Sequence, residues 1–466
     1  MSDPVHLILL TWSGLAALWW GLAVGLVLLR QRLNSAPPPS QLSPAFNRGE
    51  IPPDLARAEH REISGTSDVP PLFPTEAGGE GRGEEVLEQP GGTARGSPSP
   101  RPSPRASSQG EGALQRAAQE HSADQERLTV FKALPPVASE AARAAITEAV
   151  GSFVRELDAD AELVLGVPRE TEAEWAPTLA QWRRLDGGDR LKVRVRPTPG
   201  QHANPKVSWL EVLSADATGT LWLWSDADII APAGLLGQLR AELAAAVGSA
   251  HAVTSAYCVR RVTDVAGMAD ALFVNVEFLP GALLLGRLGT VRLSFGAAVL
   301  FRADDFSARV NWAELGASLA DDYVLGQRLA PVCISPQLVE TTAIQPGLGA
   351  ALRHLHRWQR TIRWCRPGSF AALLVVMPPL GWLAAVLVGP GDVRSWWGLA
   401  GQIAVEALAS AALMLGVGAR MPLRCWLAIL AWPVVRALGW VTAWLPLPVT
   451  WGEGKAVWRS PMRRQR

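Results

Sequence analysis

The sequence predicts an α/β domain placed between an N-terminal transmembrane helix and a C-terminal helical membrane region. Apolar stretches at both ends of the chain are long enough to cross a hydrocarbon core of about 30 Å. In the middle of the chain, short apolar runs alternate with helical patterns, which is typical of βαβ units and a mostly parallel sheet. The 466 residues include 20 Trp but two Tyr, and Trp favours the boundary between bilayer and water.

The N-terminal apolar stretch, residues 6–29, is predicted to be a transmembrane anchor. It holds no charged side chain except His6 when protonated, and the sequence "RQR" follows it directly. A cleavable signal peptide carries its positive charge before the apolar run. We therefore expect a retained anchor, with the segment that follows it in the cytoplasm.

Residues 34–125 are predicted to be a disordered linker. They are rich in Pro, Ser, Gly, Glu and Arg, as in "EQPGGTARGSPSPRPSPRASSQGEGA". They lack the regular apolar spacing that a packed core requires.

The α/β domain is predicted over residues 127–350. The expected strands are residues 127–134, 161–167, 190–197, 220–229 and 250–257. Helical patterns are present at 138–156 and 231–247. Sheets of this kind bind ligands in the crevice beyond the carboxyl ends of their strands, so we expect the functional site there.

An arginine-rich segment, residues 351–368, precedes the C-terminal apolar region, residues 369–450. We expect it to form a helix at the membrane interface, because cytoplasmic helix ends collect Lys and Arg. The last apolar stretch, 421–450, contains Arg436 and Pro433. A charge near mid-membrane is costly, so a broken or re-entrant hairpin is at least as well supported as a simple span. A hairpin would also return the basic tail to the cytoplasm.

Charge and cysteine content narrow the function classes. The chain has 44 basic and 43 acidic side chains, and this net charge of +1 gives no reason to propose nucleic acid as a partner. Its four cysteines form no CxxC pair. That pattern favours reduced, buried thiols over a zinc or redox site.

A pair of acids follows the fourth predicted strand, in "SDADII". Asp226 and Asp228 stand where the crevice is expected. Two carboxylates one residue apart can present oxygens to a hard divalent cation, which in turn binds a diphosphate. The alternative is that they are ordinary turn acids.

The tripeptide "NPK" comprises Asn204, Pro205 and Lys206. Pro favours a helix start, where free N–H groups and Lys206 would meet a phosphate. A plain helix entry explains the same residues.

The sequence "DDY" places Asp321 and Asp322 at the start of a helical pattern. They are either an acidic first turn that complements the helix dipole or the location of a general base.

Within 351–368, Arg360, Arg363 and Trp364 are spaced i, i+3 and i+4, so a helix presents them on one face. Arg binds phosphate with two parallel hydrogen bonds, and Trp packs over a ring or anchors a helix at the interface. A membrane anchor alone requires positive charge but not this spacing.

Five elements occur in a fixed order: "NPK", "SDAD", "GAAVLFR" at 296–302, "DDY" and "RTIRW", followed by apolar spans. In this order the chain resembles the ceramide glucosyltransferase family and its bacterial relatives associated with hopanoid biosynthesis. The resemblance covers about residues 127–366 and excludes the linker. It implies an inverting membrane glycosyltransferase whose catalytic domain has the GT-A fold, which is Rossmann-like.

The resemblance also implies site residues. Asp322 would be the catalytic base, and Asp226 and Asp228 would hold a divalent metal, Mg²⁺ or Mn²⁺. The implied donor-binding residues are Lys132, Asn204, Lys206, Asp226, Arg360, Arg363 and Trp364. The implied partners are a nucleotide-sugar donor such as UDP-hexose, a ceramide-like or hopanoid lipid acceptor and the bilayer. The implied location is a multi-pass protein of the bacterial inner membrane with a cytoplasmic catalytic domain.

The chain departs from the family pattern at several positions. Arg169 occupies the place of the family's first Asp, where Glu170 or Glu172 would have to substitute. Trp209 replaces an Asn, and the Gly-Gly pair expected before "DDY" is absent. These departures leave a second hypothesis, a catalytically degenerate transferase-like protein that binds or assembles other lipid enzymes.

Overall fold

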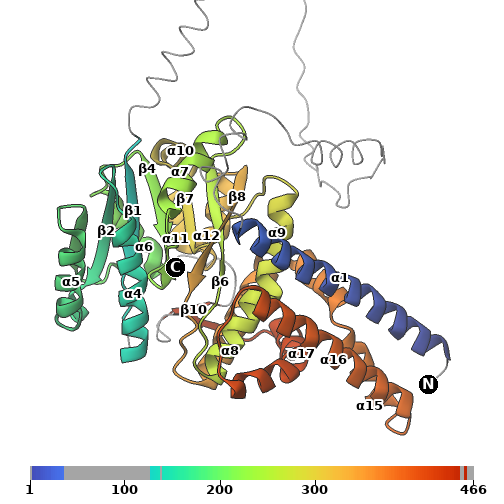
Figure 1. The fold of residues 1–466 in the computed structure, drawn as a ribbon. Helices are drawn as coiled ribbons and strands as arrows, with labels where there is room; N and C mark the ends of the chain where they lie inside the picture. The colour runs from blue at the N-terminus through green and yellow to red at the C-terminus, as the bar shows by residue number, and fades with distance from the viewer. Residues whose placement is uncertain (1–2, 36–125, 137–138, 452–455, 459–466) are drawn as a thin grey trace, which may run out of the picture. The chain divides into compact units, whose positions relative to one another are not determined.

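The structure, a computed structural model, describes residues 3–35, 126–136, 139–451 and 456–458 (Figure 1). The linker predicted at 34–125 lies outside the described residues, except for its first two, which end the N-terminal helix α1 (Asp3–Ser35). Its disorder therefore stays a prediction.

An eight-stranded mixed sheet forms the centre of the α/β domain, in the order β3-β2-β1-β4-β7-β6-β8-β5. The strands are β1 (Leu128–Ala133), β2 (Ala161–Pro168), β3 (Leu191–Arg196), β4 (Leu221–Ser225), β5 (Ile229–Ile230), β6 (Ala252–Cys258), β7 (Ala298–Arg302) and β8 (Val332–Thr341). The five predicted strands form, and β3, β2, β1 and β4 are parallel as expected. The other half is mixed, because β7 runs antiparallel to both β4 and β6.

Helices cover both faces of this sheet. They are α4 (Glu140–Glu156), α5 (Glu172–Asp186), α6 (Pro205–Ser214), α7 (Leu235–Ala245), α10 (Ala303–Arg309), α11 (Trp312–Ala317) and α12 (Asp321–Arg328), with a 3-10 turn, η3, at Arg169–Thr171. Val130 and Phe131 of β1 point to opposite faces. Val130 joins an apolar cluster with α4, α5 and α7, whereas Phe131 joins one with α6, α10, α11 and α12.

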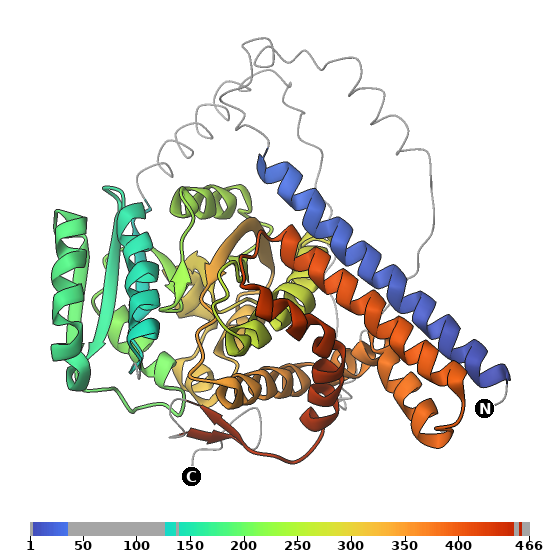
Figure 2. The same cartoon turned by 60° about the horizontal axis from the view of Figure 1, so that its bottom comes forward.

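Within the described part of the chain, four helical segments are long and apolar enough to cross a membrane. Three of them, α1, α16 (Val393–Gly416) and α17 (Leu423–Ala443), are at the predicted ends of the chain. The most hydrophobic window of each is 22–33% buried, as expected of surfaces that face lipid. Figure 2 shows α1 lying along α16, and Val27 of α1 contacts Gly416 of α16.

The fourth apolar segment was not expected from the sequence. It comprises α8 (Val265–Leu272), the π-helical turn η4 (Phe273–Phe278) and α9 (Leu279–Arg287). Its window is 67% buried. Its residues join one apolar cluster with α1, α16 and α17, so it connects the α/β domain to the apolar helices.

The helix breaks in the C-terminal region differ from the prediction. After α13 (Leu348–Cys365), the chain forms α14 (Pro367–Ala372), the 3-10 turn η5 (Leu373–Val376) and α15 (Pro378–Val388), bent by 66° at Met377. A residue that precedes proline is pushed out of the helical conformation, and Met377 has φ −122° and ψ 51°. In contrast, α17 continues through Pro433, so of the two alternatives for 421–450 the segment Leu423–Ala443 is a continuous helix. A two-stranded sheet, β9 (Val449–Trp451) with β10 (Ala456–Trp458), follows.

Arg436, the charge noted in the last apolar stretch, is buried in an ionic cluster. Its side chain is 1% exposed and lies 2.6 Å from a carboxylate oxygen of Glu406 and 3.3 Å from one of Glu277. It also donates to the carbonyl oxygen of Val376 at 2.7 Å. The cluster joins α17 to α16, η4 and η5, which explains how an apolar helix accommodates a cation.

We expect the substitution Arg436→Leu to destabilise the protein by about 3–5 kcal/mol, because it leaves Glu406 and Glu277 buried without their cation. Thermal unfolding in detergent measures this effect. The control is Arg424→Leu in the same helix, where the guanidinium is exposed and donates to the carbonyl oxygen of Thr263. Equal shifts for the two variants would show that the cluster does not stabilise the helix packing.

Candidate active site

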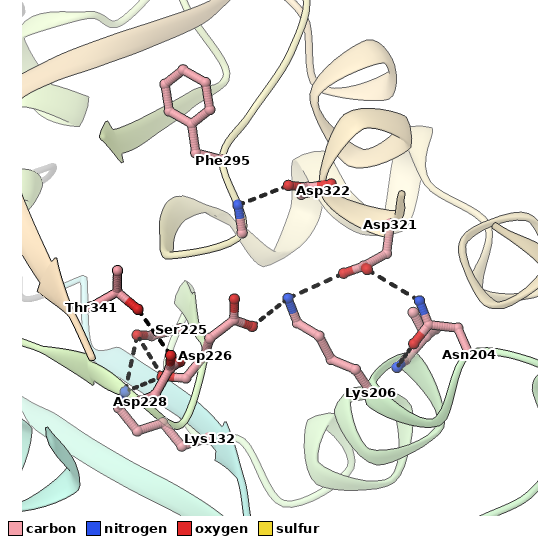
Figure 3. Close-up of polar contacts among 12 residues, drawn as sticks. Lys132, Asn204, Lys206, Ser225, Asp226, Asp228, Phe295, Asp321, Asp322 and Thr341 are labelled. Atoms are coloured by element: carbon pink, nitrogen blue, oxygen red, sulfur yellow. Dashed lines mark hydrogen bonds and ion pairs between the residues drawn. The ribbon is translucent and has the colours of Figure 1, made fainter. Parts of the chain in front are cut away.

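A cavity of about 800 Å³ opens beyond the carboxyl ends of the strands, where the sequence predicted the crevice. Its lining comes from the ends of β1, β2, β4, β6 and β8 and from α6, α8, α12 and α13. Because β4 lies near the middle of the sheet, the acids that follow β4 lie in the middle of this cavity. Asp226, Asp228 and Lys206 all contribute to the lining, and Asp321 and Asp322 complete its acidic wall (Figure 3).

Lys132 supports the loop that carries Asp226 and Asp228. It is fully buried at the end of β1, and its ammonium donates to the carbonyl oxygen of Asp226 at 2.6 Å and to Ser225 Oγ at 3.0 Å. Burial lowers the pKa of Lys132 to about 7, against the opposing effect of Asp228 and Asp226. Lys132 does not line the cavity, and its contacts are to the loop that carries the two acids.

Asp228 is held in place by β8. Thr341 Oγ1 donates to Asp228 Oδ2 at 2.9 Å. Burial raises the pKa of Asp228, and the nearby Asp226 raises it further. A cation that binds both carboxylates would relieve this repulsion.

Asn204 begins α6, as the plain helix-entry interpretation expected. Its side-chain oxygen accepts from the backbone N–H of Val207 at 3.2 Å, while its amide donates to Asp321 Oδ1 at 3.1 Å. Asn204 is fully buried and does not line the cavity. It therefore acts on the site through Asp321.

Lys206 bridges the acids of two elements. Its ammonium lies 2.7 Å from Asp226 Oδ1 and 3.3 Å from Asp321 Oδ2 (Figure 3). Burial tends to lower the pKa of Lys206, but Asp226, Asp321 and Asp322 outweigh it and raise the pKa. Lys206 thus stays charged and holds the loop after β4 against α12.

Asp322 lies in the first turn of α12 and faces the same space. Its Oδ2 accepts from the backbone N–H of Gly296 at 3.0 Å, and its Oδ1 accepts from that of Tyr323 at 2.8 Å. Burial and the neighbouring Asp321 raise the pKa of Asp322 to about 6, although Lys206 opposes them. A carboxylate with this pKa is ionised at neutral pH and is basic enough to accept a proton.

Gly296 leaves the space between the two acidic elements open. A Cβ at this position would lie 3.3 Å from Asp226 Oδ2, 3.4 Å from Asp322 Oδ2 and 3.3 Å from Lys206 Nζ. Carboxylate oxygens around such a gap are suitable donors for Mg²⁺ or Mn²⁺. Among the residues that the structure describes, no three His, Cys, Asp or Glu side chains form a metal cluster. A cation held by Asp226 and Asp228 would therefore need further oxygens from a diphosphate.

The three predicted contacts on α13 do not reach the cavity. Arg360 is 3% exposed and donates to the carbonyl oxygen of Ala443 at 3.3 Å. Its guanidinium stacks on Trp364 at 5.1 Å, and that of Arg363 stacks on Trp444 at 5.3 Å. Arg360 and Arg363 pack on the end of α17, whereas Trp364 packs near Leu319, which lines the cavity.

The cavity instead receives Arg357 and Trp358 of α13. Burial lowers the pKa of the Arg357 guanidinium, and the nearby Asp270, Asp226 and Asp322 oppose this effect. Among the described residues, the guanidinium has no ion-pair partner within 4 Å. An Arg-Trp pair recurs six residues later in the sequence, and six residues turn a helix by about 600°. The two pairs therefore lie on different faces. The resemblance implies the second pair as donor-binding, but the first pair, with the same Arg-Trp sequence, is the one that lines the cavity.

The structure also shows where the residues that depart from the family pattern lie. Arg169, Glu170 and Glu172 are all exposed, but of the three only Glu170 lines the cavity, and it accepts from Thr198. Trp209 lines the cavity and lies against Gly166 of β2. Of the two candidate acids, Glu170 has the position that the departure at Arg169 requires.

Comparison with known families defines the class of this protein as a glycosyltransferase. The family model of "Glycosyl transferase family 21" matches residues 147–461, and the chain belongs to this family. The match confirms the predicted ceramide glucosyltransferase family and, with the α/β domain between apolar helices, the predicted GT-A fold class. It supports glycosyl transfer from a nucleotide sugar.

Solved structures give remote likenesses. A mannosyltransferase from Pyrobaculum calidifontis, in complex with GDP-Man and Mn²⁺, is 18% identical, with a TM-score of 0.37, over 71% of this chain and 94% of that one. S. aureus TarS residues 1–349 are 12% identical, with a TM-score of 0.30, over 62% and 88% of the two chains. At this level of similarity, the comparison assigns no role to any residue of this chain. A search of curated protein sequences gave no match.

We expect Gly296→Ala to lower the rate of glycosyl transfer by about 10²-fold, because the added methyl group fills the space between Asp226 and Asp322 and displaces groups that must be aligned. Initial rates of nucleotide release measure the loss. The control is Gly237→Ala on α7, where a Cβ meets no atom within 4 Å. An unchanged rate for Gly296→Ala would exclude this gap as the place of reaction.

Proposed function

We propose that the protein transfers a hexose from a nucleotide sugar, such as UDP-hexose, to the hydroxyl of a membrane lipid, with inversion. The observation that carries the proposal is that Asp322, a carboxylate with a raised pKa, lines the same cavity as Asp226 and Arg357. The family match supports the nucleotide-sugar donor. The apolar helices, which share a core cluster with the cavity wall at α8, support a lipid acceptor.

Three parts of the cavity would hold the donor. Asp226 and Asp228 would bind Mg²⁺ or Mn²⁺, and the metal, when bound, would stabilise charge on the diphosphate. Arg357 would bind the same diphosphate from α13. Glu170 lies at the end of the cavity near β2, where it would contact the nucleoside.

Asp322 would be the catalytic base. In this mechanism its carboxylate takes the proton of the acceptor hydroxyl, whose oxygen bonds to the anomeric carbon while the bond from that carbon to the diphosphate breaks. A single displacement of this kind inverts the anomeric centre. Positive charge from Arg357 and Lys206 offsets the negative charge that develops on the leaving group.

The acceptor is proposed to be ceramide-like or a hopanoid. Because α1, α16 and α17 have membrane-spanning length, we propose a multi-pass protein of a bacterial inner membrane with its catalytic domain in the cytoplasm. This orientation agrees with the "RQR" after the first apolar stretch.

The purified protein tests this function directly. In detergent with Mn²⁺ and a membrane lipid extract, we expect release of free nucleotide from one or more UDP- or GDP-hexoses, together with a glycosylated lipid detected by mass spectrometry. Absence of turnover with every donor in the presence of the extract would favour the alternative, a degenerate binding or scaffold protein.

The pH dependence of kcat/KM is expected to show an acid limb near pH 6. Asp322 must be deprotonated to act, and its pKa is about 6, so activity should fall about tenfold per pH unit below that value. The substitution Asp322→Asn should remove at least about 10²-fold of the rate while nucleotide binding persists. Activity that is constant across the limb, or full activity of Asp322→Asn, would exclude Asp322 as the base.

Two matched substitutions on α13 separate its two Arg-Trp pairs. We expect Arg357→Gln to lower kcat/KM for the donor by about 10²-fold, because it removes a charged donor of hydrogen bonds to the diphosphate. Arg363→Gln, on the face that packs near Trp444, should change the donor kinetics by much less. The opposite order would show that the second pair binds the donor.

A further inference from the structure

Tyr257 presents to the cavity a phenol group that no step of the proposed mechanism uses. It is the penultimate residue of β6, and it lines the cavity together with Asp226, Asp322 and Arg357. Its hydroxyl is accessible and has no hydrogen-bond partner among the residues that the structure describes. The pairing of β6 with β8 is irregular just before Tyr257, and such irregularities re-aim side chains beside active sites. An O–H group is thus available to a ligand.

The π-helical turn η4 holds the ring of Tyr257 in place. The ring stacks on Phe278 with centroids 4.4 Å apart, and Phe278 packs edge-on against Phe295 at 4.9 Å. Asn275 of the same turn accepts from the backbone N–H of Val259 at 2.9 Å and donates to its carbonyl oxygen at 2.8 Å. Turns of this kind are frequent at functional sites. Because η4 holds both the ring and the end of β6, the hydroxyl has a fixed position before a ligand binds.

The phenol stays protonated among the charges of the cavity. Burial raises the pKa of Tyr257, and three carboxylates reinforce the effect, those of Asp322, Asp226 and Asp228. The guanidinium of Arg357 opposes them without reversing the shift. At neutral pH the side chain is therefore a neutral O–H group, which can donate a hydrogen bond to an anion and keep its proton.

The sheet places Tyr257 opposite the loop that follows β4. The strands β4 and β6 flank β7 in the sheet. Their registers show that both extend past Ala298, the first residue of β7, and β4 leads to Asp226 as β6 leads to Tyr257. A diphosphate held between Arg357 and a cation on Asp226 and Asp228 would lie in the space that Tyr257 faces. Its oxygens accept hydrogen bonds and would satisfy the free hydroxyl.

We propose that Tyr257 is a catalytic residue whose hydroxyl donates a hydrogen bond to the diphosphate of the nucleotide sugar. This inference rests on the proposed function and deepens it. When the bond from the anomeric carbon to the diphosphate breaks, its electron pair passes to the diphosphate oxygen, and the O–H group stabilises that charge while it keeps its proton. The five sequence elements that carry the family resemblance contain no residue of β6, so the resemblance does not imply this contact.

The substitution Tyr257→Phe removes the hydroxyl and keeps the stack on Phe278. We expect kcat to fall by about tenfold to 10²-fold for every hexose that is transferred, with the donor KM changed by less than about threefold, because the bond strengthens as charge develops. The matched control is Tyr323→Phe, since the Tyr323 hydroxyl accepts from Arg366 at 3.1 Å and the residue does not line the cavity. An unchanged kcat for Tyr257→Phe, an equal loss in the control or a loss confined to one hexose would overturn the proposal.

Fluorine NMR tests the contact without turnover. The chain has two tyrosines, so the full-length protein labelled with fluorotyrosine gives two resonances, which the two Phe variants assign. We expect UDP or GDP with Mg²⁺ to shift the Tyr257 resonance and not that of Tyr323, and we expect uridine or guanosine to shift neither. An equal shift with the nucleoside alone would overturn the proposal, and so would no shift when equilibrium dialysis shows the diphosphate to be bound. If dialysis detects no bound nucleotide, the proposed function itself fails.

Discussion

The ion pairs of Lys206 are the interaction on which the site depends. Asp226, Asp321 and Asp322 share one cavity, and such a concentration of buried carboxylates is unfavourable without a cation. Lys206 reaches Asp226 and Asp321 together, and it comes from the start of α6, which Asn204 caps and ties to Asp321. The "NPK" tripeptide therefore fixes the distance between the loop after β4 and the first turn of α12. Asp322 can then face the open space at Gly296 with a pKa near neutrality.

The helix α13 connects this chemistry to the apolar helices. One face carries His354, Arg357 and Trp358 to the cavity, while another packs Arg360 against the end of α17. The α8–η4–α9 segment has a similar position, since it lines the cavity at Asp270 and packs against the apolar helices beyond. An acceptor embedded in a bilayer would thus meet the acids without leaving its apolar surroundings, provided that the apolar helices lie in a membrane as proposed.

Local patterns in the sequence predicted the fold well. The strands, the acids after β4 and the helix that begins at "DDY" are signalled by residues close together in the chain, and the structure has them where expected. The antiparallel direction of β7 was not predicted, because strand direction depends on pairing between distant segments. The bend at Met377 was not predicted, and the continuity of α17 through Pro433 decides between the two alternatives for that stretch. In this continuous helix Arg436 is buried in an ion pair, which no local pattern in the sequence predicts.

For the site, the sequence identified the residue types and missed which side chains reach the cavity. Lys132 and Asn204 are fully buried and do not line the cavity, and no local pattern in the sequence predicts this placement. The choice between two Arg-Trp pairs on α13 depends on the rotation of a helix about its axis, which the sequence alone does not fix. Asp270, Gln345 and His354 also line the cavity, but the fold brings them together from α8, a loop and α13, so no local pattern predicts them.

The most direct measurement is an electron cryomicroscopy structure of the full-length protein in lipid nanodiscs with UDP and Mn²⁺. Our account predicts density for the diphosphate between Arg357 and the Asp226–Asp228 loop, with the uridine toward Glu170. Density beside Arg360 and Arg363, away from these acids, would contradict it, and so would a map with no nucleotide at saturating concentration.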